Sequence, residues 1–147
     1  MNITLKLGTY SFLKSQQNSA DTLLKPLFDD KTDHLLIKEL TRNGQYRKLT
    51  GFIDSNDEVY LLTYLKFNVD QSALFQSKFI DSDQISFNSA IYQLRDNLQE
   101  YLIISTFDNQ THMEDGRNYI QDKIDDGIRS DSKVPFGFFT KEYQVIG

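Results

Sequence analysis

One short segment of the chain, "THMEDGRNYIQDKIDDG" at residues 111–127, combines five carboxylates with one of the two histidines. Such groups can bind a cation, and a cluster of carboxylates can attract a basic protein surface. His112 and Asp115 have the i, i+3 spacing of one helix face, while Asp122 and Asp126 have i, i+4 spacing. Neither pair offers three converging ligands, so we expect no metal site here. No other motif of the sequence predicts a cofactor.

The same segment is predicted to form an amphipathic helix near residues 111–126. Thr111 and Glu114 have the spacing of a capping box, and Gly127 is a residue type that often ends a helix. The apolar stripe of the helix consists of Met113, Ile120 and Ile124. Carboxylates near a helix C-terminus cost about 0.3–1 kcal/mol each, which suggests that they are kept for a partner, although a run of charges is more often a solvated face. The expected partner-binding residues are Glu114, Asp115, Asp122, Asp125 and Asp126.

A basic segment, "KELTRNGQYRKLT" at residues 38–50, offers an alternative function. Its cations could lie along a phosphate backbone with one ring available for stacking on a base. The residues of this nucleic-acid hypothesis are Lys38, Arg42, Tyr46, Arg47 and Lys48. The net charge of -5 opposes it, and charged side chains on exposed strands also prevent aggregation. Direct nucleic-acid binding is therefore the less favoured alternative.

Composition excludes several classes of protein. A chain of 147 residues with 39% hydrophobic residues predicts a single domain over residues 1–147. The absence of cysteine excludes disulfides, a thiolate nucleophile and cysteine-ligated zinc. No phosphate-binding glycine loop or nucleophile elbow occurs. The chain begins without the features of a signal peptide and has no apolar segment of membrane-spanning length, so we expect a soluble cytoplasmic protein without membrane contact.

The elements that position these residues are predicted to form an α+β fold with a twisted antiparallel sheet. Asn43 and Gly44 predict a type I′ hairpin turn, in which Glu39 faces Lys48, within a meander over about residues 35–67. Further strands are expected near residues 3–7, 101–107 and 136–145, with a weaker one near 74–80. Two main helices are expected near 87–99 and 111–126, and a short one near 19–28. The helical spacing over 87–99 comes from Phe87, Ile91, Leu94 and Leu98.

The sequence therefore predicts a non-enzymatic protein-binding module. Its expected role is that of a small acidic inhibitor, of the immunity or mobile-element and phage counter-defence type, which masks a basic, nucleic-acid-binding surface of a partner protein. The alternatives are a nucleic-acid-binding protein that uses residues 38–48, a structural subunit of a larger assembly such as a virion, and a carboxylate-metal hydrolase. Steep salt dependence, self-association and stabilisation by Mg²⁺ would identify these alternatives in turn.

Overall fold

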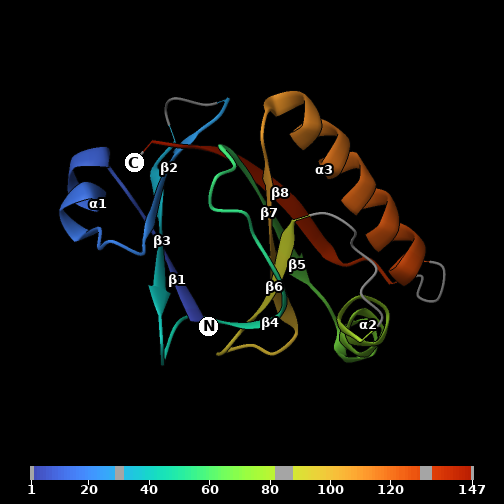
Figure 1. Ribbon diagram of the computed structural model, residues 1–147. Helices are drawn as coiled ribbons and strands as arrows, with labels where there is room; N and C mark the ends of the chain where they lie inside the picture. Colours follow the sequence, from blue (N-terminus) through green and yellow to red (C-terminus); the bar gives the residue numbers. More distant parts are fainter. Residues whose placement is uncertain (1, 29–31, 82–87, 130–133, 147) are drawn as a thin grey trace.

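The computed structural model describes residues 2–28, 32–81, 88–129 and 134–146 (Figure 1). The strands are β1 (Asn2–Gly8), β2 (Thr22–Pro26), β3 (His34–Leu40), β4 (Tyr46–Phe52), β5 (Val59–Lys66), β6 (Ser89–Leu94), β7 (Glu100–Phe107) and β8 (Gly137–Val145). The helices are α1 (Tyr10–Gln16), α2 (Val69–Phe75) and α3 (Gln110–Ile124), and π-helical turns, η1 (Gln76–Ile80) and η2 (Asp125–Arg129), extend α2 and α3. The strands form a closed antiparallel barrel in the order β1-β3-β2-β8-β5-β7-β6-β4. The predicted α+β class with an antiparallel sheet is confirmed.

The barrel consists of two halves with the same strand order. The second half, β5-α2-β6-β7-α3-β8, is a complete βαββαβ unit with the sheet order β8-β5-β7-β6. The first half, β1-α1-β2-β3-β4, has the equivalent order β4-β1-β3-β2, but a short turn replaces its second helix. The topology therefore repeats although the sequence shows no internal repeat.

Each strand of the second half has one face toward the barrel interior and one toward the helices. Tyr60 and Leu62 of β5 belong to the interior core, whereas Leu61 and Leu65 pack with α2 and α3. Figure 1 shows α2 and α3 on one side of the barrel and α1 beside β1, β2 and β3 on the other. None of the helices among the described residues is long and apolar enough to span a membrane.

The predicted hairpin and meander over residues 35–67 are wrong. Strand β1 lies between β3 and β4, so that Ile3 pairs with both Glu39 and Tyr46. The expected pairing of Glu39 with Lys48 is therefore absent, and β4 and β5 pair with other strands. The turn residues predicted a chain reversal but could not predict which strand would occupy the space between the two arms.

Three predicted elements have the wrong type. The helix expected near 87–99 is a hairpin of β6 and β7, and Phe87 lies outside the described residues. Both faces of this hairpin are buried, which removes the alternation that marks a strand. The expected strand near 74–80 lies in α2 and η1, and the expected helix near 19–28 contains strand β2.

The predicted helix at 111–126 is confirmed as α3, and Met113, Ile120 and Ile124 are buried as expected. Its N-cap is Asn109 instead of Thr111, because the Asn109 side chain accepts a hydrogen bond from the amide of His112 at 2.9 Å. Gly127 does not end the helix in a left-handed conformation and lies within η2. A Cβ atom there would lie 2.9 Å from the ring of Phe79, so close packing requires this glycine.

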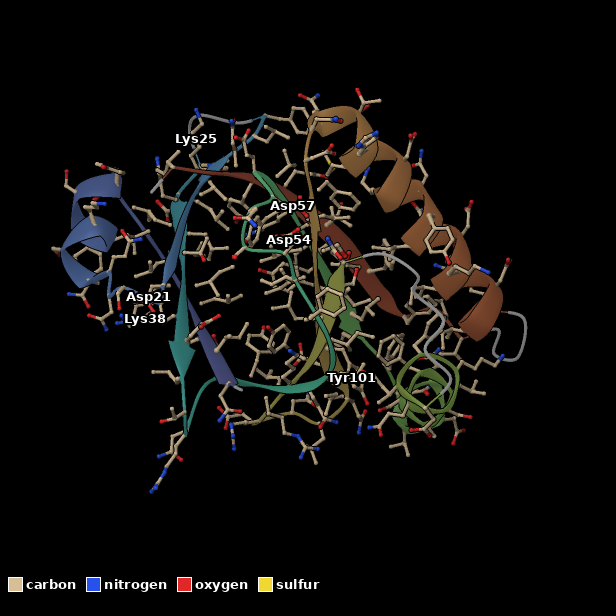
Figure 2. All side chains as sticks on the ribbon, in the orientation of Figure 1. Asp21, Lys25, Lys38, Asp54, Asp57 and Tyr101 are labelled. Carbon is tan, nitrogen blue, oxygen red and sulfur yellow. The ribbon has the colours of Figure 1, made fainter. Side chains whose placement is uncertain are left out.

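Asp21 joins the segment after α1 to strand β3. Its side chain is buried and accepts hydrogen bonds from Lys38 Nζ at 2.8 Å, from the amide of Asn18 at 2.8 Å and from that of Glu39 at 3.2 Å. Lys38 Nζ also donates to the carbonyl oxygen of Gln16 at 2.7 Å. Figure 2 shows Asp21 and Lys38 together beside α1. Burial raises the pKa of Asp21, but the hydrogen bonds and the lysine charge outweigh burial and lower it.

Replacing Asp21 by asparagine should therefore destabilise the protein in a pH-dependent way. The folded-state pKa of Asp21 is below the unfolded value of about 3.9, so the ion pair stabilises the fold above about pH 4. This contribution is lost as the pH falls through the folded pKa. Urea unfolding of parent and Asp21→Asn should differ by about 3 kcal/mol at neutral pH and converge in acid. A difference that stays constant down to about pH 2 would contradict this role for Asp21.

Candidate functional site

Five of the eight tyrosines face the barrel interior. They are Tyr46 on β4, Tyr60 and Tyr64 on β5, Tyr92 on β6 and Tyr143 on β8. They share this space with aliphatic side chains of every other strand of the barrel. An eight-stranded barrel is just wide enough to be filled by side chains or to hold one small ligand. The five rings and these aliphatic side chains pack together as one core cluster of the barrel.

Burial raises the pKa of all five phenols, that of Tyr92 to about 12. They therefore stay protonated at neutral pH and can donate hydrogen bonds. Tyr60 has a side-chain hydrogen bond with Thr22, but the described residues offer no partner to the other four hydroxyls. Among the described residues, Oγ1 of Thr63 is the one buried side-chain oxygen that has no hydrogen-bond partner.

A pocket of about 490 Å³, here called the large pocket, lies at one mouth of the barrel. It is lined by Leu7, Pro26, Phe28, Thr32, Asp33, Thr140, Lys141, Glu142 and Tyr143. Beside the pocket, β2 pairs with β8 through residues 24–26 and 143–145, and the amide of Leu27 donates to the carbonyl oxygen of Glu142 at 3.1 Å. Leu7 and Phe28 are 52% and 56% exposed, so the apolar lining is accessible from solvent.

The charged groups of the large pocket differ in how they are paired. Glu142 accepts hydrogen bonds from Arg117 of α3 at 2.8 Å and from the Thr140 hydroxyl at 3.3 Å. Lys141 and Asp33 have no ion-pair partner among the described residues. Burial raises the pKa of Tyr143, and the carboxylates of Glu142 and Asp33 raise it further. The pocket thus combines an apolar wall, a neutral phenol donor and unpaired charges of both signs.

A second pocket of about 190 Å³, here called the small pocket, is lined mostly by aromatic rings. Its residues are Tyr46, Tyr64, Leu65, Lys66, Glu100, Tyr101, Gly137 and Phe139. The rings of Tyr64 and Phe139 stack with centroids 4.7 Å apart. The Tyr101 hydroxyl lies 2.7 Å from Ser72 Oγ and accepts from Gln76 Nε2 at 2.9 Å, and Figure 2 shows this residue near α2.

The carboxylates predicted to bind a partner lie on α3 and η2, and none of them lines either pocket. Asp115, Asp122 and Asp126 are exposed, whereas Asp125 accepts a hydrogen bond from Arg129 at 2.8 Å and Glu114 accepts one from Gln110 at 3.3 Å. His112 contacts Asp108, and this pairing raises the pKa of the histidine. In the described part of the chain, no three histidine or carboxylate side chains gather as metal ligands. Binding of a partner by this helix remains untested.

The structure does not assemble the basic residues into one binding surface. The ring of Tyr46 faces the barrel interior and does not lie on the surface with Arg42, which corrects its predicted role. Lys38 is bound to Asp21, and Arg47 donates to the side-chain oxygen of Gln93 through Nε at 3.0 Å and through a second nitrogen at 2.6 Å. Arg42 is exposed, and Lys48 is half-buried.

Neither pocket was identified from the sequence. One signal was present: Tyr60, Leu62 and Tyr64 alternate along "VYLLTYLKF" and so share one face of any strand. That alternation placed two phenols together, but it could not show that the strand would close a barrel with three further tyrosines inside.

No protein-family model and no curated protein sequence matches this chain, whereas several solved structures resemble it. A ferredoxin-fold protein from Listeria monocytogenes, related to antibiotic biosynthesis monooxygenases, is 16% identical with a TM-score of 0.71, over 99% of this chain and 94% of its own. The haem-degrading enzyme LmHde from the same species is 18% identical, with a TM-score of 0.72 and 97% of each chain covered. A major regulator of staphylococcal pathogenesis is 14% identical, with a TM-score of 0.71 and 99% of each chain covered. This chain therefore has a ferredoxin-like α+β fold.

The expected function, a non-enzymatic inhibitor of a protein partner, is wrong. The structural neighbours include a haem-degrading enzyme, proteins related to monooxygenases and a regulator. None of these neighbours is described as an inhibitor, a nucleic-acid-binding protein or a virion subunit. The names of these neighbours also contradict the expectation that the chain is not an enzyme.

Proposed function

We propose that the protein binds a ring-containing small molecule in the large pocket. The observation that carries the proposal is an accessible apolar pocket at the mouth of the barrel. Tyr143 lines it, and the hydroxyl of this residue has no hydrogen-bond partner among the described residues. The pocket's volume of about 490 Å³ falls within the usual range of ligand sites, about 300–1,000 Å³, and barrel mouths are a common location for them. The ring of Phe28 and the side chain of Leu7 offer contact area, while Tyr143 can donate a hydrogen bond to a ligand oxygen.

The structural neighbours supply a class of activity to test. LmHde is named as a haem-degrading enzyme, and two other neighbours are related to monooxygenases or resemble them. We therefore propose that the bound molecule is a substrate and that this chain converts it. The large pocket supports binding of the substrate, and the neighbours' names suggest the classes of enzyme whose substrates should be tried first.

Haem itself does not fit the large pocket as a resident group. Haem iron in proteins is held by histidine, cysteine, methionine or tyrosine. The chain has no cysteine, and His34, His112 and the buried Met113 line neither pocket. Tyr143 does line the large pocket, but its raised pKa disfavours the phenolate that would bind iron. Smaller aromatic molecules are therefore better candidates.

The fluorescence of an added dye can test binding directly. The probe is N-phenyl-1-naphthylamine, a neutral aromatic dye whose emission rises in apolar surroundings. We expect saturable binding to the parent and at least about a tenfold loss in Leu7→Trp, since the indole fills the pocket from its rim. Candidate substrates would then be ranked by displacement of the dye, and incubation with those that displace it would be followed by mass spectrometry to detect a product.

The matched control is Phe52→Trp, which adds the same indole at a 66% exposed position outside both pockets. Dye affinity should be unchanged in this variant. Equal binding by the parent, Leu7→Trp and Phe52→Trp would show that the large pocket is not the binding site.

A further inference from the structure

The small pocket has the composition of a cation-binding cage. Three of its lining residues, Tyr46, Tyr64 and Phe139, are aromatic residues on the interior side of the sheet, whereas the ring of the fourth, Tyr101, packs on Phe75 on the helix side. Phe139 is 55% exposed and stacks on Tyr64, so the aromatic wall can be reached from solvent. A volume of about 190 Å³ is below the range of drug-sized ligands and suits a small head group. The faces of such rings attract alkylammonium cations through their quadrupoles.

The two charged residues that line this pocket are Glu100 and Lys66. Burial raises the pKa of Tyr46, and the Glu100 carboxylate raises it further, so this carboxylate acts directly on a phenol of the pocket wall. Lys66 is the register partner of Glu100 across β5 and β7, yet no ion pair joins them in the described part of the chain. Lys66 is exposed, and a lysine can line an apolar surface with its stem while its ammonium stays in water. The lining therefore offers a negative charge to a cation.

We propose that the small pocket is a second ligand site, which binds a quaternary or methylated ammonium group. The rings contact the methyl groups of the cation, and Glu100 supplies the opposite charge. The two pockets share no lining residue, so this site is independent of the function proposed for the large pocket. The ligand class is that of choline-like cations.

Choline and 3,3-dimethylbutan-1-ol provide the test, because the alcohol has the shape of choline without its charge. In an NMR titration of the intact protein, we expect the choline methyl signals to move upfield and to saturate, owing to the ring currents of the cage. Choline should bind about 3- to 30-fold more tightly than the alcohol. Equal affinities, or no saturable choline binding in the millimolar range, would overturn the proposal.

Variants locate the binding. Glu100→Gln and Phe139→Ala should each weaken choline binding about threefold or more, while Lys66→Met should strengthen it.

The matched control is Phe52→Ala, which removes another exposed ring and should leave choline affinity unchanged. Leu7→Trp, which fills the large pocket, should also leave it unchanged. Loss of choline binding in Leu7→Trp but not in Phe139→Ala would place the cation in the large pocket and refute the assignment. Melting temperatures would confirm that each variant is folded, and Glu100→Gln gives a test that removes no ring.

Discussion

Replacing Phe75 by alanine should lower the free energy of unfolding by about 3–5 kcal/mol, a large share of the stability of an ordinary domain. Phe75 is the last residue of α2, and its side chain is completely buried. Its ring lies 4.6 Å from that of Tyr101 and 5.3 Å from those of Phe67 and Phe79, measured between centroids. Truncation would leave a cavity where helix and sheet meet. Urea unfolding monitored by circular dichroism would measure the loss.

Phe52→Ala is the matched control for Phe75, because it makes the same chemical change at a side chain that is 66% exposed. Its effect should stay within about 0.5 kcal/mol. Similar losses in the two variants would mean that α2 does not pack on the sheet through Phe75.

Replacing Gly51 by alanine should cost about 3–5 kcal/mol through backbone strain and steric overlap. Gly51 has a φ of +86°, and a Cβ atom would lie 2.0 Å from the carbonyl oxygen of Ser89 on β6. It follows the irregularity between Lys48 and Thr50, where the register of β4 against β6 shifts. A backbone atom of a paired strand cannot move away as a flexible side chain can. The melting temperature of Gly51→Ala would therefore fall by many degrees.

The control for Gly51 is Gly8→Ala, because Gly8 lacks a positive φ and its added methyl would first meet the exposed ring of Phe12 at 3.2 Å. We expect this change to alter stability by less than about 1 kcal/mol. If Gly51→Ala melted no lower than Gly8→Ala, the bulge in β4 would be misplaced.

The sequence by itself determined the type and position of the elements that bury only one face. Helix α3 was predicted because Met113, Ile120 and Ile124 recur at helical spacing, and all three are buried. The strand expected near 3–7 was predicted from alternation, and it is β1, while the strand expected near 136–145 is β8. The strand expected near 101–107 is β7, which is buried on both faces and was predicted from its continuous apolar run instead of from alternation. One-sided burial imposes its period on residues that are neighbours in the chain, so a local pattern is sufficient to detect it.

Reasoning from periodicity failed for β6, which is also buried on both faces. In β6, Ala90 and Tyr92 face the barrel interior, while Ile91 packs toward the helices. A strand of this kind has no polar face, and its apolar residues also fit a helical spacing. The helix expected near 87–99 was the result. The type of this element could be decided only by the layers on its two sides.

Only the tertiary structure decided which strands are neighbours and where the pockets lie. The turn at Asn43 and Gly44 indicated a reversal of the chain, but β1, from the other end of the first half, occupies the space between β3 and β4. The five interior tyrosines come from four strands spread along the chain, and barrel closure brings them together. A local sequence pattern records how polar each side of an element is and contains no information about its partner. Each pocket is lined by residues that are far apart in the chain. The sequence therefore supplies the tyrosines, and only the closed barrel brings them together.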